Sequence, residues 1–282
     1  MTLLDMGYKR QKLISDIARY AVLGFVALIC IIPLIWIWSS AFKTRMEIFT
    51  APFALPTSLE FTNIVDAWTV GRFNRYFLNS IRIAIPSTLR SLVLATMGGF
   101  ATAKLRFPFR EGVFLFFLFG MTLPFQSLMM PLYSTIRGFG LINNHLGVIL
   151  PFIAFRLPFG VFFMRAFFRN LPDELMDSGR MDGCGDVRLF AYIMAPLAKP
   201  ATATLMVFFF MMSWNEFLMP LLFLQRDVLR PLTLGMMFFQ GRFSADYELI
   251  FAGITIITLP IVLVYIAFQR YFIHGLTAGA LK

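Results

Sequence analysis

Charged side chains are scarce in this sequence. They make up 14% of its 282 residues, whereas 59% of the residues are hydrophobic. A soluble domain carries roughly 25% charged residues. Because charged side chains cover the surface that a soluble domain shows to water, this scarcity excludes an ordinary soluble fold. The 35 Phe and 17 Met residues are typical of surfaces that face lipid and neighbouring helices. We predict an all-α integral membrane protein.

Cysteine and histidine are also nearly missing, with two of each. Cys30 lies in an apolar run and Cys184 in a charged loop, so the sequence gives no sign of a disulfide framework. No spacing of Cys and His indicates a metal site. The phosphate-binding pattern G-x-x-x-x-G-K-[ST] does not occur, which excludes a P-loop ATPase motor within this chain. We expect no metal and no nucleotide in this subunit.

Positive charge is present in excess, with a formal net charge of +10. The Lys and Arg residues lie between long apolar runs, where such residues set membrane topology, so no nucleic-acid partner is expected. Most of them fall on the cytoplasmic side if the N-terminus is cytoplasmic, and both termini are then predicted inside. The apolar run from Tyr20 to Trp38 exceeds the core of a signal peptide, which predicts an uncleaved first membrane helix.

The apolar runs predict about six transmembrane helices, because about 20 apolar residues cross the hydrocarbon core. They cover residues 19–40, 78–103, 112–133, 146–168, 200–224 and 250–272. We predict three parts of the chain. These are 1–75 (cytoplasmic N-terminal segment, first helix and long periplasmic loop), 76–272 (membrane core with loop 170–199) and 273–282 (cytoplasmic tail).

Prolines lie inside most of these runs. Because proline removes a backbone donor, it kinks a helix unless neighbouring groups bind the freed carbonyl. Bent or broken helices are frequent in transporters, and they also occur in membrane proteins that transport nothing. The prolines concerned are Pro33, Pro86, Pro124, Pro151, Pro158, Pro220 and Pro260.

The loop between the fourth and fifth runs is long for a connector and carries its own helix signals. Pro172 suits the first turn of a short helix that ends near Met181, before the turn at Gly183. Asp186 can cap a second short helix that stops near Pro196. Loops of this length are functional or disordered, and the apolar residues in this one disfavour disorder. We predict a compact helix–turn–helix on the cytoplasmic face.

This loop resembles the coupling loop of ABC-importer permeases. The family pattern is approximately E-L-x-E-A-A-x-x-D-G-A, followed later by P-L. The central E-A-A is replaced here by D-S-G, an acid followed by two small residues. The resemblance implies that the matching positions contact a separate ATPase; they are Glu174, Leu175, Asp177, Ser178, Gly179, Asp182, Gly183, Pro196 and Leu197.

Further stretches resemble the carbohydrate branch of these permeases, the maltose and glycerol-phosphate type, in the same order. They are YFLNSI (76–81), KLRFPFR (104–110), LPFQSLMMPLY (123–133), SWNEFLMPL (213–221) and GLTAGALK (275–282). The resemblance implies a type I ABC importer permease fold in the bacterial plasma (inner) membrane. It implies a binding-protein-dependent sugar importer in which this chain forms half of the translocation pathway.

The resemblance also implies the partners of this multi-pass subunit. Apart from membrane lipid, they are a second permease of related but different sequence, two cytoplasmic P-loop ATPase subunits, a periplasmic or lipid-anchored sugar-binding protein, and a carbohydrate substrate. The chain itself is then no enzyme and holds no cofactor, whereas ATP and Mg²⁺ bind to the partner ATPase.

Polar residues inside the apolar runs are candidates for the translocation path, because such groups normally face the protein interior or a water-filled cavity. They are Gln126, Ser127, Arg156, Trp214, Asn215 and Glu216. A structural role between helices accounts for them equally well, and Glu216 could pair with Arg156. By resemblance, the loop 225–249 meets the binding protein through Gln240, Gly241, Arg242, Phe243 and Tyr247.

Two other classes of membrane protein compete with an importer permease. A membrane-embedded lipid-modifying enzyme would need acids or histidines clustered at one membrane face, but the acids here gather in loop 170–199 without histidine. An ion-driven secondary transporter would need intramembrane carboxylates, and only Glu216 is available. The substrate stays open among a neutral oligosaccharide, a glycerol phosphate and an acidic sugar.

Overall fold

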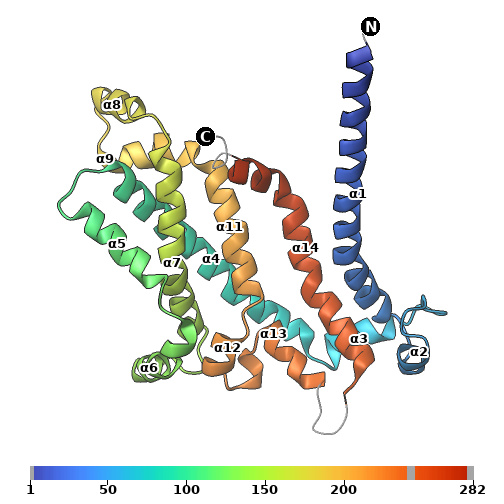
Figure 1. Cartoon of the computed structure of the whole chain (residues 1–282). Helices are drawn as coiled ribbons and strands as arrows, with labels where there is room; N and C mark the ends of the chain where they lie inside the picture. Colours follow the sequence, from blue (N-terminus) through green and yellow to red (C-terminus); the bar gives the residue numbers. More distant parts are fainter. Residues whose placement is uncertain (1–2, 240–244, 278–282) are drawn as a thin grey trace. The chain divides into compact units, whose positions relative to one another are not determined.

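The computed structural model describes residues 3–239 and 245–277, which form helices joined by loops (Figure 1). No β-strand occurs among these residues, so the all-α prediction is confirmed. The α-helices are α1 (Leu3–Ser40), α2 (Arg45–Thr50), α3 (Thr62–Thr69), α4 (Phe73–Lys104), α5 (Arg110–Gly120), α6 (Phe125–Gly138), α7 (Leu146–Arg169), α8 (Glu174–Met181), α9 (Asp186–Arg188), α10 (Ala195–Leu197), α11 (Lys199–Trp214), α12 (Leu218–Phe223), α13 (Leu232–Gly235) and α14 (Tyr247–Thr277). A π-helix covers Leu189–Met194, and 3₁₀-helices cover Asp227–Leu229 and Met236–Phe239.

Four helices are long and apolar enough to cross a membrane, and two bent helix pairs raise the possible number of spans to six. The four are Lys12–Ser40 within α1, Phe73–Lys104, Leu146–Arg169 and Tyr247–Gln269 within α14. They correspond to the predicted runs 19–40, 78–103, 146–168 and 250–272, which are therefore confirmed as helices.

The predicted run 112–133 is not one helix. It consists of α5 and α6, whose axes differ by 99° across a break of a few residues. Pro124 lies at the N-cap of α6 in an extended conformation, with ψ of 131°. Because the residue before a proline avoids the helical region, α5 cannot continue through Leu123 into α6. A bend at this proline replaces the predicted straight span.

The predicted run 200–224 is also not one helix. α11 ends at Trp214, and the short α12 follows after Phe217. Pro220 cannot donate a backbone hydrogen bond, which leaves the carbonyl of Glu216 without its helical partner. The hydroxyl of Thr233 donates to this carbonyl at 2.8 Å. At its other end α11 meets the helical run Asp186–Leu197 at a bend of 79°.

The chain divides into two compact units. The first contains Met1–Gly71 with Phe239–Ile256, and the second contains Arg72–Phe238 with Ile257–Lys282. α14 therefore contributes its first turns to one unit and the rest to the other. The three parts predicted from the sequence, with bounds 1–75, 76–272 and 273–282, stay a prediction.

The second unit is built around α4 and α7, which pack on each other more extensively than any other pair of helices. α11 covers α4, and α5 covers α7. Small residues allow this close approach: a Cβ atom at Gly160 would lie 2.5 Å from Ala95 and 2.8 Å from Phe209.

Asn143, in the loop before α7, has a left-handed backbone conformation with φ of +58°. Its side-chain oxygen accepts from the amides of Gln225 and Arg226 at 2.8 and 2.9 Å.

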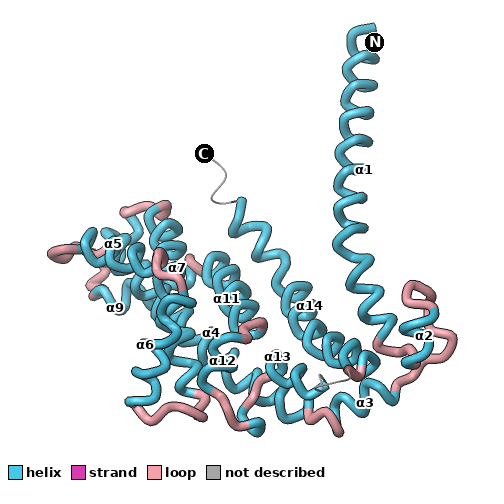
Figure 2. The backbone as a smooth tube through the Cα atoms, turned by 60° about the horizontal axis from the view of Figure 1, so that its bottom comes forward, coloured by secondary structure: helices cyan, strands magenta, loops and turns pink. Residues whose placement is uncertain are grey.

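The first unit contains α1, α2, α3 and the first turns of α14. After α1 ends, α2 and the loop behind it fold back beside the last turns of α1 (Figures 1 and 2). Trp36 of α1 packs edge-on against Phe251 of α14, with 5.3 Å between the ring centroids. Phe49 of α2 packs in the same way on Tyr247, at 5.2 Å.

Candidate functional site

The loop 170–199 contains the helix–turn–helix expected from the sequence. α8 ends in a turn in which Gly183 has φ of +79°, a conformation that glycine adopts without steric cost. The amide of Gly183 donates to the carbonyl of Arg180 at 3.0 Å, and that of Cys184 to Gly179 at 2.9 Å. This pair of bonds is the Schellman pattern of helix ends, and it fixes the direction in which the chain leaves α8.

The second helix of the loop runs from Asp186 to Leu197 and includes six residues in π-helical form. The prediction that Asp186 caps this helix is wrong, because Gly185 occupies the N-cap position and Asp186 is the first helical residue. The Asp186 carboxylate instead lies 3.5 Å from the Arg180 guanidinium. Single π-helical turns are rare and are frequent at functional sites.

One face of the loop is packed against the membrane helices. Met176 of α8, with Leu189 and Met194 of the second helix, belongs to the same buried cluster as Phe100 of α4 and Phe168 of α7. Figure 1 shows α8 and α9 beside the ends of α4 and α7. Loop 170–199 is therefore packed on these two helices through a shared apolar cluster.

Gly179 allows α8 to lie close to the second helix. It is buried, and a Cβ atom at this position would collide with Leu189 and lie 2.7 Å from Ile193. A residue larger than glycine would force the two helices of the loop apart. The small residues of the motif, at least at this position, thus serve packing within the loop.

Lys104 ties the start of the loop to the end of α4. Its side chain is 5% exposed, and its ammonium donates to the carbonyl of Leu171 at 2.6 Å and to the carboxylate of Asp173. The hydrogen bond from Lys104 lowers the pKa of Asp173 below its ordinary value. The loop is therefore connected to α4 by polar contacts as well as by the apolar cluster.

Other side chains of the loop are exposed, and one of them, Val187, lies at the edge of a groove against α4. Met181, Val187 and Tyr192 are 88%, 81% and 77% exposed. Sequence reasoning missed these three, although an apolar residue beside a glycine turn in a charged loop could have signalled them. Of the motif positions, Gly179 is buried and Leu175 is half-buried. The others are exposed: Glu174, Asp177, Ser178, Asp182, Gly183, Pro196 and Leu197.

All candidates for the translocation path belong to the second unit, and two of them, Arg156 and Trp214, are buried there. The Arg156 guanidinium donates to the hydroxyl of Ser87 at 3.4 Å and lies 4.4 Å from the centre of the Phe152 ring. The Ser87 hydroxyl is 3.0 Å from that of Ser213, the neighbour of Trp214 in the chain. Arg156 is thus connected to α4 and α11 through a short chain of hydroxyls.

The indole of Trp214 donates to the carbonyl of Ile257 at 3.0 Å and stacks on Phe210. Its neighbour Asn215 is exposed and Glu216 is half-buried. The carboxylate of Glu216 accepts from the amide of Leu218 at 2.9 Å, which stabilises the start of α12.

No ion pair joins Glu216 to Arg156 in the described part of the chain, so the hypothesised pairing is not seen as a direct contact. Gln126 and Ser127 are exposed in the first turn of α6. Within the described ranges, no hydrogen bond connects their side chains to the other candidates. The structure therefore brings Arg156 close to the end of α11 and leaves Gln126 and Ser127 apart.

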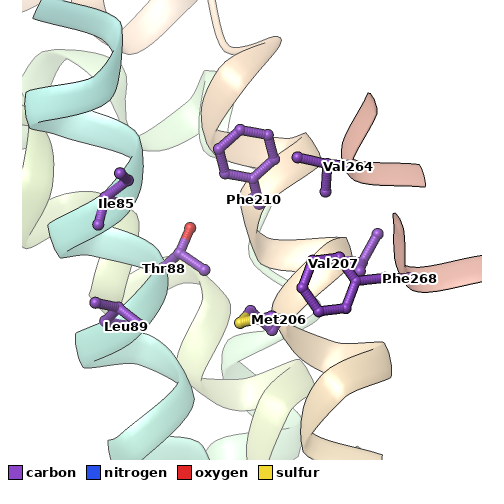
Figure 3. A pocket seen from close by; sticks show the side chains of 8 residues that line it. All are labelled: Ile85, Thr88, Leu89, Met206, Val207, Phe210, Val264 and Phe268. Atoms are coloured by element: carbon purple, nitrogen blue, oxygen red, sulfur yellow. The ribbon is translucent and has the colours of Figure 1, made fainter. Parts of the chain in front are cut away.

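A cavity of about 160 Å³ lies between α4, α11 and α14 (Figure 3). Thr88 supplies the only hydroxyl among the residues that line it, and the other lining side chains are apolar. A sugar needs several hydrogen-bonding partners, so this cavity does not suit a carbohydrate. The polar candidates named above do not line it.

Four of the five residues expected to meet a binding protein fall outside the described part of the chain. Gln240, Gly241, Arg242 and Phe243 lie outside the described residues. Tyr247 is described, and it is exposed by 41% at the start of α14.

Comparison with known proteins identifies the family. Residues 91–277 match the family described as binding-protein-dependent transport system inner membrane component. The diacetylchitobiose uptake system permease protein NgcG of Streptomyces coelicolor is 34% identical over 265 residues, 93% of this chain and 88% of that protein. The arabinooligosaccharides transport system permease protein AraQ of Halalkalibacterium halodurans is 35% identical, over 92% of this chain and 94% of that protein.

The fold has a counterpart among solved structures. A bacterial ABC transporter involved in the import of the acidic polysaccharide alginate contains a chain that superposes with a TM-score of 0.82. The two chains are 24% identical, and the match covers 93% of this chain and 98% of the other. The type I importer permease fold expected from the sequence is confirmed. This chain belongs to the binding-protein-dependent transport system inner membrane components, the non-enzymatic, multi-pass permease subunits of ABC importers.

Proposed function

We propose that this chain forms half of the translocation pathway of a sugar importer and that loop 170–199 is its contact with a separate ATPase. The proposal rests on which side chains of loop 170–199 are buried and which are exposed. Its buried side chains are continuous with the cluster of α4 and α7, whereas its exposed apolar side chains, here called the free face, include Met181, Val187 and Tyr192. A rigid body with a free apolar face can pass a partner's movement directly to the membrane helices.

The chemistry of the free face suits a protein partner. Exposed apolar side chains surrounded by charged ones are typical of an interaction surface. Here the surrounding acids include Glu174, Asp177 and Asp182. In this proposal the partner ATPase holds ATP and Mg²⁺, two copies of it serve the transporter, and its closure moves the membrane helices between inward-open and outward-open states.

The orientation follows from the distribution of Lys and Arg. The side that holds Lys104, Arg165 and loop 170–199 carries more positive charge than the opposite side, which favours a cytoplasmic position. Both termini are then cytoplasmic. In this proposal the loop between α1 and α4 and the segment 225–249 face the periplasm, and Tyr247 contacts a periplasmic or lipid-anchored binding protein.

The substrate class comes from the relatives. Two of them are named for diacetylchitobiose and for arabinooligosaccharides, and we infer an oligosaccharide or a sugar derivative for this chain. Half of a pathway requires a second permease, which in this proposal is a related but different chain. The Arg156–Ser87–Ser213 chain offers polar groups near the end of α11, where a passing sugar hydroxyl could bind.

A double substitution on the free face of the loop tests the proposal. Met181→Asp with Val187→Asp should abolish copurification of the ATPase and ATP-dependent oligosaccharide uptake, because charges would replace the apolar contact. The matched control, Met181→Leu with Val187→Ile, keeps the face apolar and should preserve both. Full ATPase copurification and uptake in the aspartate variant would contradict the proposal.

A further inference from the structure

The segment after α1 forms a hook that folds back along the helix it has just left. We define the hook as residues 42–61, which include α2. Phe53, Ala54 and Leu55 line a groove whose other wall consists of residues of α1, from Ile32 to Ser39. The ring of Phe53 lies 6.0 Å from that of Trp36. Figures 1 and 2 both show the loop after α2 turning back beside the last turns of α1.

The depth of the hook along α1 can be measured in helical turns. α1 ends at Ser40, and the groove reaches Trp36 and Ile32. With a rise of 1.5 Å per residue, these positions lie about 6 and 12 Å before the end of the helix. Lys12–Ser40 is a candidate membrane span, so the hook reaches a level that the span itself occupies.

The turn of the hook is apolar throughout. Its sequence from Ala51 to Pro56 is A-P-F-A-L-P, without a charged or polar side chain. Phe53 is 87% and Leu55 is 78% exposed. Exposure of this apolar turn to water would be unfavourable. Burial in lipid removes the apolar surface of the turn from water, which is favourable.

The hook binds its own polar groups, as a non-helical segment at membrane depth must do. The Pro52 carbonyl accepts from the Trp36 indole at 2.6 Å and from the Lys43 ammonium at 2.8 Å. The Lys43 side chain is buried and also donates to the Ala51 carbonyl at 3.4 Å. Glu47 accepts from the amides of Thr44 and Thr57 at 2.9 and 3.0 Å.

We propose that the apolar turn 51–56 inserts into the lipid leaflet at the C-terminal end of α1 and anchors that end of the helix in the membrane. Trp36 then lies in the interfacial zone that Trp and Tyr favour, with the apolar ring of Phe53 beside it. The occupant of the exposed surface is membrane lipid, since the turn lies beside a membrane-spanning helix and carries no charge. The proposal requires only that α1 spans the membrane, and it does not depend on the role of loop 170–199.

Spin-label accessibility in the assembled transporter, reconstituted into phosphatidylcholine–phosphatidylglycerol vesicles, tests the insertion. Cys30 and Cys184 are first replaced by Ala, and single labels are then placed by Phe53→Cys, Leu55→Cys and Ser58→Cys. Ser58 is the matched control, because it is exposed in the same hook and its hydroxyl donates to Glu60. Oxygen concentrates in lipid, and a water-soluble nickel chelate stays outside it.

We expect the labels at Phe53 and Leu55 to have a several-fold higher ratio of oxygen to nickel accessibility than the label at Ser58. Equal ratios at all three positions would mean that the turn faces water and would overturn the proposal. Low accessibility to both reagents at Phe53 and Leu55 would mean that a protein partner covers the turn, which would overturn it as well. Leu55→Cys gives an independent reading if Phe53→Cys does not assemble. Uptake is not a readout here, so failure of the anchor is distinct from failure of the proposed function.

Discussion

Loop 170–199 and the hook 42–61 are two segments between long helices that the chain stabilises in different ways. Loop 170–199 is fixed by apolar packing, since its underside shares a buried cluster with α4 and α7. The hook is fixed by polar side chains that bind its backbone. Lys43 and Trp36 donate to the Pro52 carbonyl, and Glu47 accepts from backbone amides. We expect a cluster shared with the membrane helices to suit force transmission, and local hydrogen bonds to suit an anchor.

Among single substitutions, the largest effect is expected at Gly179, where a Cβ atom would collide with Leu189. Gly179→Val would place side-chain atoms where Leu189 and Ile193 lie, and overpacking of this kind costs about 1–3 kcal/mol. We expect ATP-dependent uptake in proteoliposomes to fall by about tenfold, which corresponds to about 1.4 kcal/mol. Gly185→Val is the matched control, because nothing lies within 4 Å of a Cβ atom there. Equal uptake by both variants would refute the packing role.

A smaller effect is expected when the polar attachment of the loop to α4 is removed. Lys104→Met deletes the ammonium that donates to the Leu171 carbonyl and to the Asp173 carboxylate. The apolar cluster persists in this variant, so the ATPase should still bind while less sugar is transported per ATP hydrolysed. The exposed Lys199, replaced by Met, serves as the control. An unchanged ratio of uptake to hydrolysis in Lys104→Met would show that the attachment does not contribute to coupling.

A substitution at Lys43 should destabilise only the hook. Lys43→Met removes the ammonium that holds the Pro52 and Ala51 carbonyls, with a local loss of about 1–3 kcal/mol. We expect faster protease cleavage within 44–59 and little change in uptake. Arg45→Met is the control, since its ion pair with Asp246 at 3.7 Å is exposed and such pairs contribute about 0–1 kcal/mol. Cleavage at the wild-type rate would contradict the role given to Lys43.

The smallest effect concerns pH. The hydrogen bond from Thr57 is the largest of the interactions that lower the pKa of Glu47 from 4.5 to about 2. A lowered pKa in the folded state means that the stabilisation is fully present above pH 4.5 and is lost as the pH falls toward 2. A spin label at Ser58 should therefore keep its mobility as the pH is lowered from neutral to 4.5. Glu47→Gln should be more mobile already at neutral pH, and equal mobility of the two proteins would contradict this assignment.

Much of the fold could be predicted because hydropathy alone identifies membrane helices. α1, α4, α7 and α14 correspond to predicted runs. The breaks could not be placed from hydropathy, since the residues on both sides of Pro124 are apolar and a window average does not separate α5 from α6. Glu216 was assigned to the interior of a span, yet it lies beyond the end of α11 and stabilises the start of α12.

The candidate site could be predicted in position and not in detail. The motif indicated loop 170–199 and its glycine turn, but residue types do not reveal which side of a short helix is packed. Gly179 is buried, whereas Met181 and Val187 are exposed. The sequence predicts one long periplasmic loop where the hook lies, although T-R-M-E at 44–47 carries the capping-box pattern that begins α2. Bonds from side chains to carbonyls, such as that from Lys43, have no sequence signature.

The central claim is that another subunit's ATP hydrolysis moves the membrane helices through direct contact with loop 170–199. Cysteine crosslinking measures this contact most directly. A single cysteine is introduced by Val187→Cys in a chain without Cys30 and Cys184, and a short photoactivatable crosslinker is attached to it in the assembled transporter. The account predicts one crosslinked product that contains the ATPase, whose yield changes when ATP is bound. Efficient labelling without any crosslink to the ATPase, in a transporter that still drives uptake, would contradict it.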